Sequence, residues 1–297
     1  AQAIWGQVGQ LLTFELVSFG LLLCMMTTST CAAGSLMSLS RDPVALFEIC
    51  SYCDGSALFR ARATSSGTFP CNVVLSCLKH RLRHSEWKHR AEAVWDLRWA
   101  MCKGDNSVLS VVIAQLASDD DCSHGSEYAA CFNMRAFMVM SAKAPRGDAD
   151  VVSAAIRYTQ HGDEATRDAA VGALGRVAQK DHAESIHSIV ACLKDEDEDV
   201  QGSAMHALQY GQLATTGNQV VVGGLVEFIG NEENNVDHRT EGIEALTAWA
   251  SKDDMDAVRC LISCLQSEHD SMVTAALEGL ENLAMNSDTS LATTGNQ

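Results

Sequence analysis

Apolar residues recur at three- and four-residue steps in a series of stretches that runs through most of the chain. In the stretch at 185–195, Ile186, Ile189, Val190 and Leu193 fall on one face of a helix. A second stretch, rich in small and apolar residues, follows each of the first kind after a short polar segment. This alternation predicts a series of units, each made of a helix, a polar turn and a second helix.

The second helices of these units share one register, in which small residues precede a single large apolar residue. The intervals between these large residues are 34 to 40 residues. Because a two-helix unit cannot bury its apolar face alone, units with this period must stack on one another. The sequence therefore predicts an all-α fold, an α-solenoid of about six helical pairs. The large residues that close the six units are Leu97, Phe137, Leu174, Leu208, Leu246 and Leu280.

The start of each second helix resembles the HEAT-repeat family. The usual pattern of that family places Asp, then Val-Arg, then Ala and Leu at this point. The stretch DEDEDVQGSAMHAL at 195–208 is the best match, although Gln201 stands where the family prefers Arg. Arg167 and Arg239 keep the arginine in two other copies, and Val273 replaces it in the last. The resemblance implies a curved array of HEAT-like pairs whose extended surface binds other proteins.

The solenoid is predicted to occupy residues 70–291, followed by a linker-like tail at 292–297. Seven residues, LATTGNQ, occur at 213–219 and again at 291–297. The first copy is predicted to link two repeats, because Thr, Gly and Asn favour helix ends and turns. No repeat follows the second copy, so we expect either a fragment of a longer solenoid or a partner that covers the last pair.

An apolar segment is predicted at 1–40, where Glu15 is the single charged residue, and a connector rich in Ser, Gly and Ala follows at 41–69. The uncharged run at 16–37 is long enough to cross a bilayer, which takes about 20 residues. Three interpretations stay open for it: a membrane helix, a targeting peptide, and a helix buried against the solenoid or another protein. If it spans a membrane, the basic residues that follow, such as those at 79–90, place the solenoid on the cytoplasmic, stromal or matrix side.

The net charge of −17 is concentrated in the second half of the chain. Residues 148–297 contain 26 acidic and 8 basic residues, whereas residues 1–147 are nearly neutral. Such an acidic module repels phosphate groups, which disfavours nucleic acid as its ligand. Its acidic turns are instead candidates for contact with a basic partner, and they should lie on one edge if the repeats stack regularly. The alternative is a solvated face that keeps the protein soluble. The candidate contact residues are Asp195, Asp197, Asp199, Glu232, Glu233, Asp253 and Asp254.

The sequence offers little that is arranged for catalysis. It contains no phosphate-binding glycine loop and no G-x-S-x-G motif. Deoxyhypusine hydroxylase, which also resembles a short HEAT array, binds iron through His-Glu pairs, and no His-Glu dipeptide occurs here. We therefore predict a non-catalytic protein–protein interaction scaffold with no cofactor. The more specific hypothesis is an accessory subunit of a larger assembly, anchored in a membrane if residues 16–37 span one.

Two alternatives to a scaffold stay open. A HEAT-like bilin lyase would hold a tetrapyrrole on a related array, and the sequence neither marks nor excludes such a pocket. Residues 50–99 could form a metal- or RNA-binding module, since thiols and imidazoles bind zinc and a basic run with tryptophans can bind RNA. Core packing is the ordinary interpretation of the same cysteines and tryptophans. The residues concerned are Cys50, Cys53, Cys71, Cys77, His80, His84 and His89 for a metal, and Trp87, Trp95 and Trp99 for RNA.

Overall fold

The computed structural model describes residues 71–118, 121–122 and 127–285, and the regular elements in these ranges are α-helices. The chain divides into two compact units, residues 1–101 and residues 102–297. Within the described residues, no helix is both long and apolar enough to cross a membrane. The predictions of an apolar segment at 1–40, a connector at 41–69 and a tail at 292–297 fall outside the described residues.

The first unit contains one described helical pair, α5 (Cys71–Arg81) and α6 (Trp87–Ala100). Arg81, the last residue of α5, forms ion pairs with Glu92 and Asp96 on α6 at 3.4 and 3.5 Å. The two helices enclose a small apolar core, as the pattern of this region predicts. Five of its side chains have no exposure to solvent: Leu78, Leu82, Ala93, Val94 and Leu97.

The second unit contains five helical pairs, each with a shorter first helix and a longer second helix. Together with the pair in the first unit they confirm the prediction of an all-α fold with six pairs. The five pairs are α7 (Asn106–Ile113) with α9 (Glu127–Lys143), α10 (Ala149–Tyr158) with α11 (Glu164–Val177), α12 (Ala183–Cys192) with α13 (Glu198–Tyr210), α14 (Gln219–Gly230) with α15 (Val236–Trp249), and α16 (Met255–Cys264) with α17 (Asp270–Met285).

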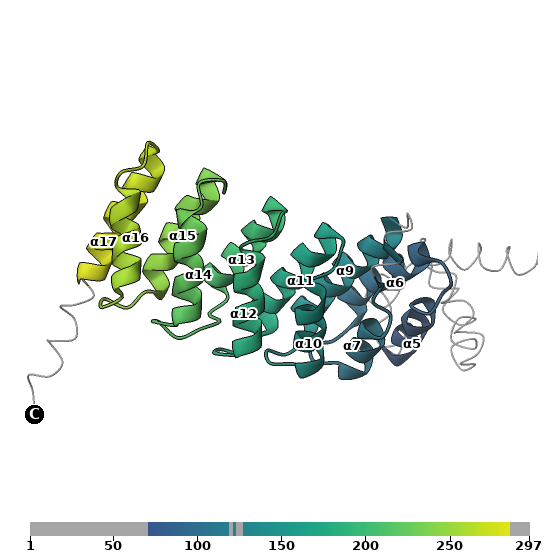
Figure 1. The fold of residues 1–297 in the computed structure, drawn as a ribbon. Helices are drawn as coiled ribbons and strands as arrows, with labels where there is room; N and C mark the ends of the chain where they lie inside the picture. The colour runs from purple at the N-terminus through teal and green to yellow at the C-terminus, as the bar shows by residue number, and fades with distance from the viewer. Residues whose placement is uncertain (1–70, 119–120, 123–126, 286–297) are drawn as a thin grey trace, which may run out of the picture. The chain divides into compact units, whose positions relative to one another are not determined.

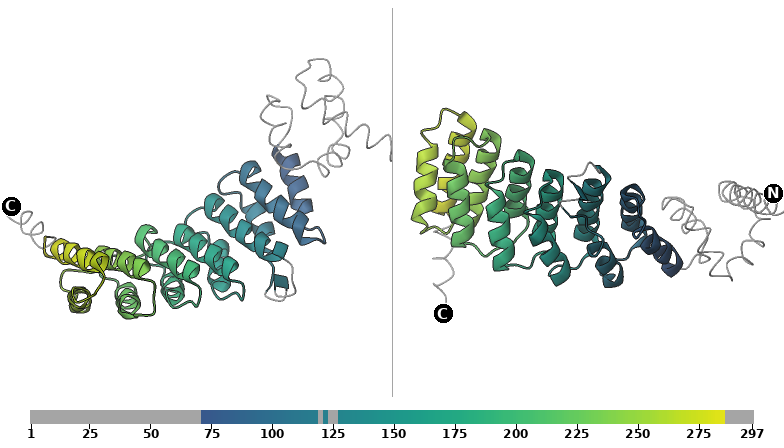
Figure 2. Two further views of the ribbon diagram at one scale, coloured as in Figure 1. Left: turned by 90° about the horizontal axis from the view of Figure 1, so that it is seen from above. Right: turned by 45° about the vertical axis from the view of Figure 1, so that its right-hand side comes forward.

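The pairs of the second unit stack as two layers. The first helices contact one another in one layer, and the second helices contact one another in the other (Figures 1 and 2). The core lies between the layers, where Leu174, Leu208 and Leu246, the closing residues of three predicted units, have no exposure to solvent. The sequence register therefore identifies the buried face of the second helices correctly.

This stacking gives the second unit two edges of different origin. Turns within pairs, at 159–163, 193–197, 231–235 and 265–269, form one edge, which we call the turn edge. Linkers between pairs form the opposite edge, which we call the linker edge. These linkers are at 144–148, 178–182, 211–218 and 250–254.

Consecutive linkers are joined by a repeated backbone hydrogen bond. A residue with a left-handed φ donates its N–H to a carbonyl at or just beyond the end of the second helix of its pair. The last carbonyls of a helix have no partner inside the helix, and this bond satisfies one of them in α9, α11 and α15. In the α12–α13 pair the acceptor is Leu213, just beyond α13. The four bonds run from Gly104 to Lys143 (2.8 Å), Gly147 to Val177 (2.6 Å), Asp181 to Leu213 (2.7 Å) and Gly217 to Trp249 (2.6 Å).

The first copy of LATTGNQ forms one of these linkers, as predicted. Gly217 supplies the left-handed position with a φ of 84°. The Asn218 side chain accepts hydrogen bonds from the N–H groups of Val220 and Val221, and so caps the start of α14. The second copy, at 291–297, falls outside the described residues.

We expect Gly217→Ala to destabilise the second unit by about 1–2 kcal/mol, because a residue with a Cβ is strained in the left-handed region. Space is not the reason, since the nearest atom to that Cβ, in Ser251, would be 3.7 Å away. Gly172→Ala is the control: a Cβ at this position in α11 meets nothing within 4 Å, and alanine should stabilise the helix by about 0.5–1 kcal/mol. Urea unfolding followed by circular dichroism measures both changes. Unfolding of Gly217→Ala at the wild-type urea midpoint would contradict the prediction.

Candidate functional site

A groove of about 500 Å³ lies on the turn edge, between the turn that joins α12 to α13 and the turn that joins α14 to α15. One side is formed by residues 193–196 and the other by residues 233–235. Gly224, Glu227 and Phe228 of α14 line the groove between these two turns. It is thus built from two neighbouring repeats and is a product of their stacking.

Side-chain caps hold both turns of the groove in place. Asp197 accepts hydrogen bonds from the N–H groups of Asp199 and Val200, at 3.1 and 3.2 Å, and so caps α13. Asn235 accepts one from the N–H of Asp237 at 2.9 Å and caps α15. Because capping fixes the chain direction at a helix start, the turns are ordered before any ligand arrives.

The side chains at the HEAT-like arginine position bind the carbonyls at the end of the preceding helix or turn. Arg239 Nε donates to the Ile229 carbonyl at 2.8 Å, and Gln201 Nε2 donates to the Asp195 carbonyl at 2.7 Å. Gln201, the departure from the family pattern, therefore keeps the local hydrogen bond of an arginine. It lacks the charge needed for an ion pair with the next turn.

Arg167 makes the additional contact to the next repeat. Its Nη1 donates to the carbonyls of His161 and Gly162 in its own turn, at 3.0 and 3.2 Å. Its Nε and Nη2 donate to the two carboxylate oxygens of Asp195, at 2.9 and 2.7 Å. The hydrogen bond with Asp195 raises the pKa of Arg167. This bidentate pair joins the turn before α11 to the turn before α13.

Asp195 is therefore directed into the fold, although the sequence makes it a candidate contact residue. Its side chain is 11 % exposed, and the charge is compensated by Arg167. Glu196 beside it is 91 % exposed. The accessible negative charge at this turn thus comes from Glu196 and from Glu198 and Asp199 at the start of α13. Of these three, only Asp199 is a predicted contact residue.

The surface of the groove is acidic. Lys194 is the one basic residue that lines it, and its Nζ lies 2.7 Å from the carboxylate of Glu227. Exposed Glu198 and Glu233 have no ion-pair partner among the described residues. Phe228 and Leu193 also line the groove, but they are only 3 % and 2 % exposed, so the accessible lining is chiefly polar and acidic. Such a lining suits a cationic side chain.

Of the seven predicted contact residues, four lie in turns of the turn edge (Asp195, Asp197, Glu232 and Glu233), and Asp199 lies beside them in the first turn of α13. Asp253 and Asp254 belong to the linker at 250–254, on the opposite edge, so the expectation of one shared edge is wrong for them. Asp254 is 7 % exposed. It caps α16 by accepting from the N–H groups of Asp256 and Ala257, and it also accepts from Gln219 Nε2 at 3.0 Å. Its role is structural.

Further exposed acidic residues lie on the second helices and are not among the predicted contact residues. Glu241 and Glu244 lie on α15, and Glu278 and Glu281 lie on α17. Their spacing of three residues places each pair on one helix face, and this signal was available in the sequence. The acidic surface thus continues beyond the turns.

The cysteine and tryptophan side chains differ in burial and in whether the structure describes them. Cys192, Cys260 and Cys264 are buried in the core, and burial raises the pKa of Cys192 to about 11. Trp87 and Trp95 are half-buried, with the guanidinium groups of Arg90 and Arg98 over their rings at 4.3 and 3.8 Å. Residues 50 and 53 fall outside the described residues, and the side chains at 71, 77 and 99 are not described.

Comparison with known proteins agrees with the repeat architecture. Residues 126–209 match the family model of HEAT repeats. No curated protein matches the sequence significantly. A HEAT-like repeats protein from the archaeon Thermococcus onnurineus NA1 has a TM-score of 0.54 and 11 % identity, over 82 % of this chain and 97 % of that chain.

Two other solved structures are less similar. An engineered protein has a TM-score of 0.47 and 17 % identity, over 71 % of this chain and 96 % of that chain. Human deoxyhypusine hydroxylase, solved in complex with glycerol, has a TM-score of 0.39 and 12 % identity, over 86 % of this chain and 100 % of that chain. At these identities a likeness concerns the fold alone, and the archaeal protein carries that comparison.

We expect Arg167→Ala to lower the free energy of unfolding by about 3 kcal/mol, because it leaves Asp195 charged and nearly buried without its partner. Arg259→Ala is the control, since the Arg259 side chain is 70 % exposed and pairs with Asp256 at 2.9 Å within one helix. Its loss should cost about 0.5 kcal/mol or less. Chemical denaturation of the three proteins gives the comparison. Equal effects of the two substitutions would show that the Arg167–Asp195 pair does not join the repeats.

A second prediction concerns Asp168 on α11, which accepts a hydrogen bond from the Ser203 hydroxyl on α13. Burial raises its pKa, and the charges of Asp199 and Asp197 raise it further. A raised pKa means that the folded state binds the proton more tightly than the unfolded state. The charged carboxylate therefore costs stability at neutral pH, and this cost disappears as the pH falls through the raised pKa.

Asp168→Asn should accordingly stabilise the protein at pH 7, by on the order of 0.5 kcal/mol. The gain should shrink when unfolding is measured at successively lower pH. Asp253→Asn, at an exposed position in a linker, should change stability little at any of these pH values. A less stable Asp168→Asn variant at pH 7 would mean that the carboxylate contributes more through its hydrogen bond than burial costs it.

Proposed function

Because this chain is a HEAT-repeat protein, we propose that it is a non-catalytic scaffold that binds a basic segment of a partner protein in the groove on its turn edge. HEAT repeats generally mediate protein–protein interaction, and stacked pairs present a long continuous surface for it. The observation that carries the proposal is the acidic groove between two capped turns of neighbouring repeats.

The chemistry of the groove favours lysine or arginine side chains from the partner. The charged ends of these side chains can reach the exposed carboxylates of Glu198 and Glu233, both of which line the groove. A volume of about 500 Å³ accommodates a few side chains of an extended segment, not a folded domain. Lys194 forms an ion pair with Glu227, so the partner's cations are expected to bind chiefly at the other acidic groups.

The ordered turns support binding in a second way. The caps at Asp197 and Asn235 and the Arg167–Asp195 pair already fix the walls of the groove. A partner therefore does not have to order these turns when it binds, and less of the interaction energy is lost to conformational entropy. The excess of acidic residues at 148–297 adds a long-range attraction that speeds the approach of a basic partner.

A more specific form of the proposal makes the protein an accessory subunit of a larger complex, bound to a membrane through residues 16–37. Its support is the uncharged run in the sequence, which falls outside the described residues. Native purification from gently solubilised membranes, with bound proteins identified by mass spectrometry, tests this form. A fixed set of membrane-complex subunits at near-equal abundance is expected, and recovery of the chain alone in the soluble fraction would contradict it.

We expect charge reversal in the groove to weaken binding of a basic segment at least about 10-fold, since several charge-assisted contacts are lost together. The variant is Glu196→Lys, Glu198→Lys and Glu233→Lys in one chain. The matched control, Asp150→Lys, Glu184→Lys and Asp253→Lys, makes the same change in net charge at exposed positions of the linker edge. The probe is a fluorescently labelled extended peptide rich in Lys and Arg, titrated at 0.15 M salt.

At this salt concentration charges more than about 8 Å away are largely screened, so the control should retain most of the wild-type affinity. Thermal unfolding of both variants checks that each is folded. If both variants lose affinity equally, the attraction is spread over the whole surface, and the groove is not the binding site. Unchanged binding of the groove variant would also show that the groove is not the binding site.

A further inference from the structure

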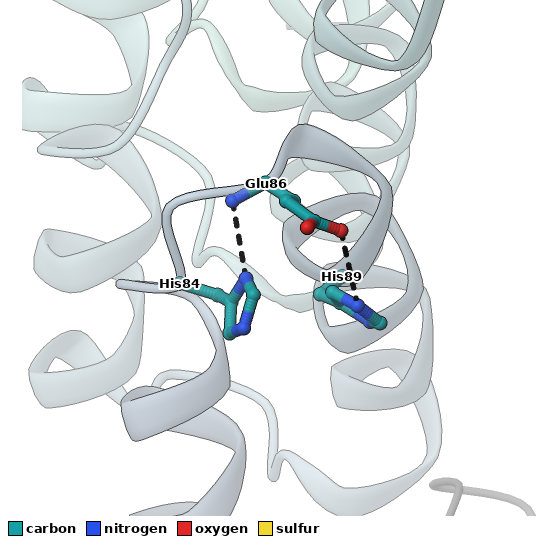
Figure 3. Close-up of side chains that lie close together, drawn as sticks. All are labelled: His84, Glu86 and His89. Carbon is teal, nitrogen blue, oxygen red and sulfur yellow. Dashed lines mark hydrogen bonds and ion pairs between the residues drawn. The ribbon is translucent and has the colours of Figure 1, made fainter.

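Three side chains with metal-binding groups meet at the turn between α5 and α6 in the first unit. His84 lies in the turn, Glu86 occupies the N-cap position of α6, and His89 lies in the first turn of that helix. Ligand atoms of the three residues all lie within 4.8 Å of one another (Figure 3). Within the described residues, no other group of three His, Cys, Asp or Glu side chains meets this criterion.

The distance between two of these atoms matches a zinc site. His89 Nε2 and Glu86 Oε2 are 3.3 Å apart. Two atoms that each bind Zn²⁺ at about 2.0–2.1 Å with a tetrahedral angle between them lie about 3.3–3.4 Å apart. The nitrogen and the oxygen can therefore bind one ion with little movement.

His84 supplies the third group. Its Nδ1 accepts a hydrogen bond from the Glu86 backbone N–H at 3.1 Å, and its ligand atom lies within 4.8 Å of those of Glu86 and His89. The rings of His84 and His89 are 4.5 Å apart between centroids and nearly perpendicular. A metal bound at Nδ1 would replace this hydrogen bond, and only the exposed ring of His84 has to turn.

A second carboxylate lies near His89. Glu92 Oε2 is 3.7 Å from His89 Nδ1, which is within ion-pair range but longer than a hydrogen bond. Metal-binding histidines commonly donate their other ring N–H to a carboxylate, which leaves the lone pair of the first nitrogen for the metal. Glu92 is itself held by Arg81 at 3.4 Å, so both helices of the pair support the arrangement.

The side chain of Glu86 is not used for helix capping. It makes no side-chain hydrogen bond to the start of α6, although it occupies the N-cap position. Asp163, Asp197 and Asn235, the N-cap residues of three other second helices, all make such bonds. The Glu86 carboxylate is directed toward His89 instead (Figure 3).

We propose that His84, Glu86 and His89 bind a zinc ion that joins the α5–α6 turn to the first turn of α6. Two imidazoles and one carboxylate suit zinc and related first-row metals, whereas Mg²⁺ and Ca²⁺ prefer oxygen ligands. Three protein ligands leave one position for water, as expected at an exposed site. Because the ion binds the folded turn and not the unfolded chain in this geometry, it stabilises the first helical pair.

The test is a calorimetric titration of the full metal-free chain with Zn²⁺ under reducing conditions. The chain contains 12 cysteines and 10 histidines, so other zinc sites can contribute, and the readout is the difference between variants. His89→Ala and Glu86→Gln should each remove one zinc equivalent or weaken it at least about 10–100-fold. Glu92→Gln, which removes a neighbouring carboxylate but no ligand, should weaken the same equivalent less than either of these substitutions.

His187→Ala is the matched control. His187 is also exposed on a helix, where its Nδ1 lies 2.7 Å from the Ala183 carbonyl, and its loss should leave the zinc stoichiometry and affinity unchanged. NMR of the imidazole groups gives an independent readout, since Zn²⁺ should shift two histidine signals that are missing in His84→Ala and His89→Ala. Mg²⁺ should shift neither signal.

Unchanged zinc stoichiometry and affinity in both His89→Ala and Glu86→Gln would overturn the proposal. An equal response of the imidazole signals to Mg²⁺ would overturn it as well. Circular dichroism without metal checks that the variants fold, which is expected because all five substituted side chains are at least partly exposed.

Discussion

The second unit depends on how the backbone groups at the ends of short helices find partners. Each first helix has only 8 to 12 residues, so a large share of its N–H and carbonyl groups lies in its terminal turns. At the linker edge, a left-handed residue such as Gly147 or Gly217 donates its N–H to the end of the second helix. This bond closes the first four pairs of the second unit, so the spacing of these repeats is set by the backbone as well as by the apolar core.

At the turn edge, side chains supply the hydrogen-bond partners for backbone groups at helix ends. Arg167, Gln201 and Arg239 donate to carbonyls at the ends of first helices or in the turns, and Asp and Asn residues cap the second helices. In the sequence alone, these side chains would be counted as exposed polar or charged residues. Asp195 is an example, because its carboxylate compensates Arg167 inside the stack while its neighbour Glu196 remains in solvent.

Much of this fold follows from the sequence alone, because apolar spacing identifies helices and the buried face of the second helices. The candidate site follows only in part. Linkers such as 250–254 and turns such as 231–235 are both short, polar and acidic, so composition cannot tell which edge they occupy. Asp254 was therefore placed on the wrong edge, and the inward direction of Asp195 was missed, since each depends on a partner in another repeat, Gln219 or Arg167.

The separation of the two turns that form the groove depends on contacts at both edges of the second unit. Its walls come from two turns one repeat apart, and their separation is set by the packing of α12 on α14, where a Cβ at Gly224 would collide with Val190. The same separation is held at the other end of the helices by the bonds of Asp181 and Gly217. A ligand that contacts both turns therefore responds to the spacing of the repeats, and a single isolated pair could not present this surface. Acidic side chains alone are common on soluble proteins, whereas here two capped turns of neighbouring repeats hold them along the same groove.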